Sequence, residues 1–296
     1  AIDVNYKKLN TDPQRPLVNR SINGDLYPPG SIFKVITAAA ALSSGEYTED
    51  SMLPGPAVLE LPGTTASLPN MFPGACGAND QVSFTRAMAI SCNTAFASVG
   101  MDIGADALRA QAEKFGFGDS LSVPMRVTPS TIPAELNMPQ LAQSSIGQFD
   151  VRVTPLQMAM VAAGVANDGA VMKPYLVQSV IGSDLSVIET TDPQELSQAV
   201  TPDVAAQLTR MMEAVVTDGS GTRAQIDGVA VAGKSGTAQH GEGRKPHAWF
   251  ISFAPADDPQ IAVAVIAEDG GTTGSEIGGG RVAAPIARQM MEARLK

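Results

Sequence analysis

Ser31 and Lys34 are the first residues in the chain whose types and spacing could perform covalent chemistry. They follow Pro28-Pro29-Gly30 and precede an alanine-rich run, so the sequence predicts a helix that starts at or next to Ser31 and carries both side chains on one face. A serine hydroxyl is a poor nucleophile until a base takes its proton, and the lysine amine could be that base. Free N–H groups at the helix start would favour developing negative charge. The alternative is a serine that only caps the helix and a solvated lysine.

Two further polar groups follow where regular structure is predicted to break or end. Ser91 and Asn93 separate a helix that starts at Ser83 from the apolar segment 94–99. Lys234-Ser235-Gly236 lies in the run 229–238, which reads as a strand with a glycine-rich end. The three groups therefore stand at a helix start, in a loop between helices and at a strand end.

Other catalytic patterns find less support. Residues 228–235 fit the nucleotide-binding pattern G-x-x-x-x-G-K-[ST], but the variable residues are apolar and β-like, and the residues after Gly236 cannot form the required helix. The stretch 270–274 reads as a glycine-rich turn after a strand. No G-x-S-x-G pattern occurs, and His240 and His247 lie too close together in sequence to favour a Ser-His-Asp triad.

Composition indicates a globular chain of one large domain or two small ones. It has 296 residues, of which 44% are hydrophobic and 17% charged. The net charge of −10 and the absence of a basic run exclude nucleic acid as a partner. No apolar run reaches the ~18 residues of a membrane span. The chain starts at Ala1 without a Met, so we expect a mature form or a fragment.

The two cysteines, Cys76 and Cys92, leave two readings open. They are buried thiols if the compartment is reducing, whereas in an exported protein a disulfide worth ~3 kcal/mol is expected. Together with the two histidines they show no metal-ligand spacing.

The remaining pattern predicts a helical part followed by a sheet. Residues 1–30 are polar and irregular, 46–81 are rich in Pro and Gly with one strand at 57–61, and 31–118 are otherwise mainly helical. Helices are predicted to start after Thr154 and Thr201, where Pro occupies the first helical position. The runs 229–238, 248–253 and 261–266 are joined by short turns, which favours antiparallel pairing, and a helix over 284–295 closes the chain.

The stretches 28–34, 91–96, 145–158 and 232–239 together resemble class B penicillin-binding proteins, most closely the actinobacterial penicillin-binding protein A type. The resemblance covers nearly the whole chain. It implies an α/β, penicillin-binding protein/β-lactamase-like fold, with an antiparallel sheet flanked by helices plus a mainly helical lobe. Residues 1–296 would be one transpeptidase domain, with the helical lobe at about 35–165 and the sheet lobe mostly at 166–296. We expect the family's N-terminal membrane anchor and pedestal domain to be absent from this chain.

The resemblance also implies a role for each motif residue. Ser31 would attack a peptide carbonyl, Lys34 would accept its proton, and Ser91 would relay a proton to the leaving amine. Asn93 would orient the substrate amide, and Lys234 would lower the pKa of Lys34 and, with the hydroxyls of Ser235 and Thr237, hold the substrate's carboxylate. Gly236 would let the substrate approach the strand, and backbone N–H groups of Ser31 and Thr237 would form the oxyanion hole. No metal or organic cofactor is implied.

The expected function is cross-linking of peptidoglycan stem peptides that end in D-Ala-D-Ala, in cell division or cell shape, at the extracytoplasmic face of a bacterial membrane. β-Lactams would trap Ser31 covalently. A serine β-lactamase and a penicillin-sensing receptor domain are the alternatives. Residues 133–137 resemble the loop that carries the deacylating Glu of class A β-lactamases, but Pro133 occupies its place and cannot act as a base.

Overall fold

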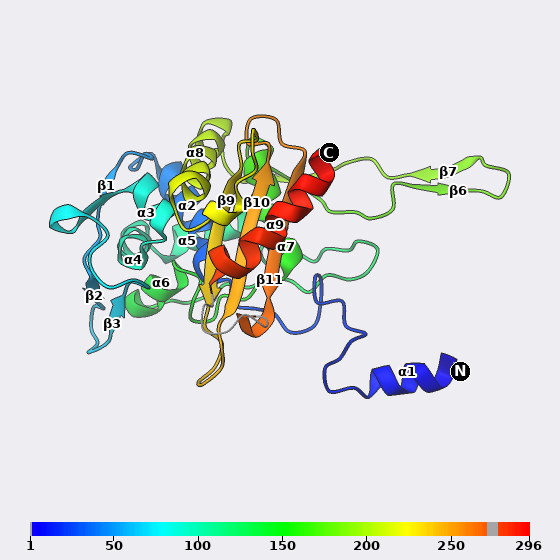
Figure 1. Cartoon of the computed structure of the whole chain (residues 1–296), viewed down its shortest axis with the longest axis horizontal. Coiled ribbons are helices and arrows are strands. Elements are labelled where there is room, and N and C mark those ends of the chain that lie inside the picture. Colours follow the sequence, from blue (N-terminus) through cyan, green and yellow to red (C-terminus); the bar gives the residue numbers. More distant parts are fainter. Residues whose placement is uncertain (1, 271–277) are drawn as a thin grey trace.

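A three-stranded antiparallel sheet forms the centre of the molecule (Figure 1). The computed structural model describes residues 2–270 and 278–296. The described strands lie in the order β11-β10-β9, with β9 at Ala232–Ala238, β10 at His247–Ala254 and β11 at Ile261–Ala267. Phe250 pairs with Ser235 on one side and with Val265 on the other. The predicted late sheet and its antiparallel pairing are confirmed, while the turn predicted at 271–274 lies outside the described residues.

Helices cover both faces of this sheet because the side chains of β10 alternate between two cores. Trp249, Ile251 and Phe253 join the main core, to which α7 (Pro155–Ala166) contributes. Phe250 belongs to a second core with α9 (Gly279–Leu295). All residues of β10 are buried, as expected for a strand without a solvent-facing side. The closing helix starts five residues earlier than predicted.

The helical part is built around α2 (Lys34–Ser44), whose residues from Lys34 to Leu42 are all buried. It packs against α4 (Asn93–Ile103), α5 (Ala105–Lys114) and α8 (Pro202–Asp218). Gly45 adopts the left-handed conformation, with φ 78°, and ends the helix where the sequence predicts. α8 also packs against α3 (Phe84–Ile90) and β9, and α7 packs against β10 and β11, so these two helices connect the helical part to the sheet.

The start of α2 differs from the prediction. Residues Gly30–Phe33 form a 3-10 turn, η1, and the α-helix begins only at Lys34. Ser31 therefore does not cap the helix but sits inside the turn that precedes it. The other helix starts agree with the sequence: Ser83, Thr154 and Thr201 each accept a hydrogen bond from a backbone N–H of the first turn.

The remaining elements lie around this body. They are α1 (Ile2–Asn10), α6 (Met138–Ser144), β1 (Met52–Pro54) paired with β4 (Gln81–Ser83), β2 (Val58–Glu60) with β3 (Ser67–Pro69), β5 (Ala170–Met172) with β8 (Glu195–Gln198), β6 (Ser179–Ile181) with β7 (Val187–Thr190), and 3-10 turns at Ala78–Asp80, Thr222–Ala224 and Glu268–Gly270. The strand predicted at 57–61 is β2. Helix α1 and the β6–β7 hairpin, which project from the body (Figure 1), are not predicted by the sequence pattern. None of the described helices has the length and apolar character that a membrane span requires.

Candidate active site

The turn that carries Ser31 is pressed against strand β9. Gly30 has φ 56°, and a Cβ there would lie 2.7 Å from the carbonyl oxygen of Thr237. A Cβ on Gly236 would lie 3.0 Å from Ile32 Cγ2 and 3.1 Å from a backbone oxygen of the same turn. Both glycines are thus required for the close approach of turn and strand. The missing side chain of Gly236 makes room for the Ser31 turn, and Gly236 also lines the cleft described below, so its predicted contact with substrate stays a prediction.

Two buried lysines meet at the hydroxyl of Ser91. Lys34 Nζ lies 3.1 Å from Ser91 Oγ and Lys234 Nζ lies 2.9 Å from it. Lys34 Nζ also donates to the carbonyl oxygen of Ser91 at 2.7 Å and to Asn93 Oδ1 at 2.8 Å. Lys234 Nζ donates to the carbonyl oxygen of Ser235 at 2.9 Å. The first, second and third motifs are therefore joined in one hydrogen-bonded network.

The electrostatics of this network favour a neutral amine. Both lysine side chains are fully buried, and no carboxylate pairs with either of them within the described residues. Burial, and then the nearby charge of Lys234, lower the pKa of Lys34 well below its usual value. Burial also lowers the pKa of Lys234 to about 7. For the pKa of Lys34, desolvation is the larger cause and the charge of Lys234, the cation expected from the sequence, is the second.

The Ser91–Asn93 loop is held by the long Pro- and Gly-rich segment that precedes α3. Ser91 has φ 61°, a left-handed conformation that is uncommon for serine and that ends α3. Asn70 Oδ1 accepts the backbone N–H groups of Asn93 at 3.0 Å and Thr94 at 3.2 Å, which are orphan donors at the start of α4. Asn93 Nδ2 donates to the carbonyl oxygen of Pro69 at 3.1 Å. This segment therefore positions the second motif.

A disulfide fixes the same region. Cys76 and Cys92 are bonded, which ties the Pro- and Gly-rich segment to the residue between Ser91 and Asn93. Cys92 itself is fully buried. Of the two readings left open by the sequence, the structure contains the disulfide.

Strand β9 forms one wall of a cleft with a volume of about 700 Å³. Ser31, Ser91, Ser235 and Thr237 all line it. Within the described part of the chain Ser31 Oγ forms no hydrogen bond, so the hydroxyl is available to a molecule in the cleft. Ser220, from the loop after α8, also lines the cleft, and its Oγ lies 2.6 Å from Ser235 Oγ.

Five of the predicted residues line the cleft: Ser31, Ser91, Ser235, Gly236 and Thr237. Lys34, Asn93 and Lys234 do not line it but join Ser91 in the hydrogen-bonded network. The structure adds two residues that the sequence did not single out. These are Asn70 and Ser220, which act through the second and third motifs. The loop resembling that of class A β-lactamases contributes nothing to the described cleft lining, because Glu135 is exposed and Asn137 caps α6. The geometry is that of a serine-dependent acyl-transfer site: a hydroxyl open to a cleft, buried amines of lowered pKa, and hydroxyl groups opposite.

Comparison with known proteins places the chain in one family. Residues 3–292 match the penicillin binding protein transpeptidase domain, and the chain belongs to this family. It is 48% identical over 297 residues to the peptidoglycan D,D-transpeptidase PbpA of Mycolicibacterium smegmatis and 45% identical over 298 residues to that of Mycobacterium tuberculosis. Each match covers 98% of this chain and 59% of the relative, so the chain spans about three-fifths of their length.

Solved structures agree with this assignment. The ceftriaxone acyl-enzyme complex of penicillin-binding protein A from M. tuberculosis matches with a TM-score of 0.93 and 44% identity, covering 98% of this chain and 65% of that one. The D,D-transpeptidase domain of a peptidoglycan glycosyltransferase from Eggerthella lenta matches with a TM-score of 0.87 and 31% identity, covering 100% and 72%. The predicted family and α/β fold are thereby confirmed.

Proposed function

We propose that this chain is the catalytic domain of a peptidoglycan D,D-transpeptidase that is acylated at Ser31 and trapped there by β-lactams. The observation that carries the proposal is the shared hydrogen-bonded network of Lys34, Ser91 and Lys234 beside the open hydroxyl of Ser31. The names of the relatives, and the acyl-enzyme complex of the M. tuberculosis protein, support the same reaction.

Acylation begins with proton transfer from Ser31 to the neutral amine of Lys34 as the hydroxyl attacks the carbonyl of the penultimate D-Ala. The backbone N–H groups of Ser31 and Thr237 hold the developing oxyanion, a contribution of ~3 kcal/mol per donor. Ser91 Oγ, in contact with both amines, passes a proton to the departing D-Ala amine. An amine of a neighbouring stem peptide then attacks the acyl group and frees Ser31.

Substrate binding is assigned to strand β9 and to Asn93 at the start of α4. The positive charge of Lys234 and the hydroxyls of Ser235 and Thr237 face the terminal carboxylate, while Asn93 orients the substrate amide. We further propose that residues 1–296 form one transpeptidase domain, and that the whole protein is membrane-anchored and works outside the cytoplasm in cell division or cell-shape maintenance.

Intact-mass spectrometry after mixing with excess benzylpenicillin, followed over an hour, tests the proposal. We expect a persistent adduct of one drug mass that Ser31→Ala abolishes. An adduct that disappears while the drug is hydrolysed would indicate a β-lactamase, and no adduct would refute acyl transfer. Turnover of a D-Ala-D-Ala stem peptide then separates a transpeptidase from a penicillin-sensing domain, which would be acylated without cross-linking.

A further inference from the structure

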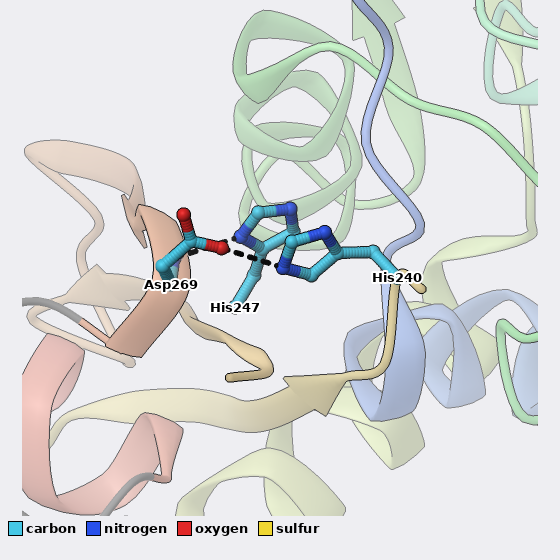
Figure 2. Close-up of side chains that lie close together, drawn as sticks. All are labelled: His240, His247 and Asp269. Atoms are coloured by element: carbon cyan, nitrogen blue, oxygen red, sulfur yellow. Dashed lines mark hydrogen bonds and ion pairs between the residues drawn. The ribbon is translucent and has the colours of Figure 1, made fainter. Parts of the chain in front are cut away.

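Two histidines and an aspartate converge at the end of the sheet beyond strand β9 (Figure 2). His240 follows β9, His247 begins β10 and Asp269 comes two residues after β11. One ring nitrogen of each histidine and a carboxylate oxygen of Asp269 all lie within 4.8 Å of one another. We propose that these three residues bind a single Zn²⁺ ion, and that the ion clamps the three strand ends together.

The positions of the donor atoms fit this assignment. His240 Nε2 lies 2.8 Å from Asp269 Oδ1 and 2.9 Å from the carbonyl oxygen of Lys245. Figure 2 shows a nitrogen of each imidazole turned toward Asp269. With bonds of about 2.1 Å, the donors of a tetrahedral zinc site are roughly 3.4 Å apart, so the ligands need to move by on the order of 1 Å. The ion replaces the proton that His240 now shares with Asp269.

The surroundings keep the three side chains close together, but zinc binding requires a rearrangement: an ion bound in the plane of each imidazole cannot be shared by two parallel stacked rings, so at least one ring must turn out of the stack. The two imidazole rings are stacked, with centroids 3.5 Å apart and planes 4° from parallel. His247 is buried and its Nδ1 accepts the backbone N–H of Asp269 at 3.1 Å, a hydrogen bond that zinc must displace to bind through this nitrogen. Arg244 Nη2 donates to Asp269 Oδ2 at 3.1 Å and to Oδ1 at 3.4 Å, and Oδ1 also contacts His240 Nε2. The contact of Arg244 with the carboxylate is an outer contact of the kind found around metal ligands.

The donor chemistry selects zinc among common ions. Two imidazoles, which are borderline donors, with one carboxylate, a hard donor, form a mixed set of the kind that binds Zn²⁺, whereas Ca²⁺ and Mg²⁺ require more oxygen ligands. The three residues line a cavity of about 1220 Å³, which gives the ion an entry path and leaves room for water in the fourth position. The site is structural, since the residues that we assign to acyl transfer line the other cleft.

The test uses the full chain prepared without a polyhistidine tag and freed of metal by a chelator. Zinc is then titrated by calorimetry and against a chromophoric zinc indicator, and thermal unfolding is followed with and without zinc. We expect one zinc per chain and a Tm increase on the order of 5 °C when zinc is present at about 100 times its Kd. Cobalt in place of zinc should give the visible absorption bands of tetrahedral coordination.

His240→Gln and Asp269→Asn should each weaken zinc binding by roughly 100-fold or more. Glu242→Gln, which removes an exposed carboxylate from the same loop, should leave zinc binding unchanged. Penicillin acylation of His240→Gln reports correct folding and is expected to match the parent, so that loss of zinc binding can be separated from failure of the proposed function. The proposal would be overturned if the zinc titration produced no heat and zinc caused no Tm shift. It would also be overturned if both variants bound zinc as tightly as the parent.

Discussion

Asn70→Ala is expected to destabilise the domain and to slow acylation, although Asn70 is not a motif residue. Asn70 is 9% exposed, and its Oδ1 accepts the N–H groups of Asn93 and Thr94 at the start of α4. Its Nδ2 donates to the carbonyl oxygens of Pro56 at 3.0 Å and Gly74 at 3.2 Å. Alanine leaves two N–H donors without an acceptor, at a cost of about 1–3 kcal/mol each.

The expected loss in the free energy of unfolding is therefore about 3 kcal/mol, or a Tm decrease of roughly 5 °C for a chain of this length. Because Asn93 Oδ1 also accepts from Lys34, we expect a looser loop to slow acylation about tenfold, which corresponds to about 1.4 kcal/mol. Calorimetry measures the first quantity and stopped-flow acylation by a fluorescent penicillin the second. Asn70→Asp keeps an acceptor at the helix start and should lose less stability.

Asn137→Ala provides the matched control. It removes the capping box of α6, away from the cleft, and should cost about 1 kcal/mol without changing the acylation rate. The reasoning would be wrong if Asn70→Ala were no less stable than Asn137→Ala, or if it acylated at the parent rate despite the expected destabilisation.

The other predictions concern the lysines, the third motif and the disulfide. The acylation rate should have a bell-shaped pH dependence. It should rise as Lys34, whose pKa lies well below its usual value, loses its proton, and it should fall as Lys234, with a pKa of about 7, loses its own. An acylation rate that still rises at pH 10 would contradict this. Ser220→Ala should lower acylation efficiency roughly threefold to tenfold by removing the partner of Ser235, and Ser220→Thr should restore it, whereas equal rates in all three proteins would exclude positioning by Ser220. Reduction of the disulfide should cost about 3 kcal/mol, and an unchanged Tm in protein whose two thiols have been alkylated after reduction would show that the bond is dispensable.

The sequence predicted the site where short-range chemistry determines it. Ser31 and Lys34 are linked by helical spacing, and Lys234 by its place in an apolar strand, so each motif could be found within ten residues of chain. The 3-10 turn at Ser31 could not be predicted, because the helical sequence pattern begins before Lys34, where the backbone becomes α-helical. The contact between Gly236 and Ile32 also escaped, since it depends on how closely turn and strand pack.

Long-range partners account for the rest of what was missed. Asn70 lies 23 residues before Asn93, in a segment without periodicity, and only a search for a polar residue amid Pro and Gly would have singled it out. The proximity of His240 and His247 to Asp269 was not visible in the sequence because Asp269 follows a different strand. The β6–β7 hairpin consists of short, exposed strands, which leave no alternating burial pattern to detect.

Burial of the two lysines has two opposite effects: it lowers the stability of the folded state, and it lowers the pKa values of the amines, which the reaction requires. Each amine has an ordinary pKa of 10.5 and a lower one in the fold, so the unfolded chain holds more protons between those two values. The free energy of unfolding should therefore rise with pH, and for Lys234 this rise spans the range from pH about 7 to pH 10.5. Near neutral pH, burial of the lysines lowers the free energy of unfolding by several kcal/mol. A Lys34→Met chain would be expected to gain stability as it loses its base. The hydrophobic packing around α2 and β10 must supply that difference, which makes the core of this domain a condition for the basicity of its active site.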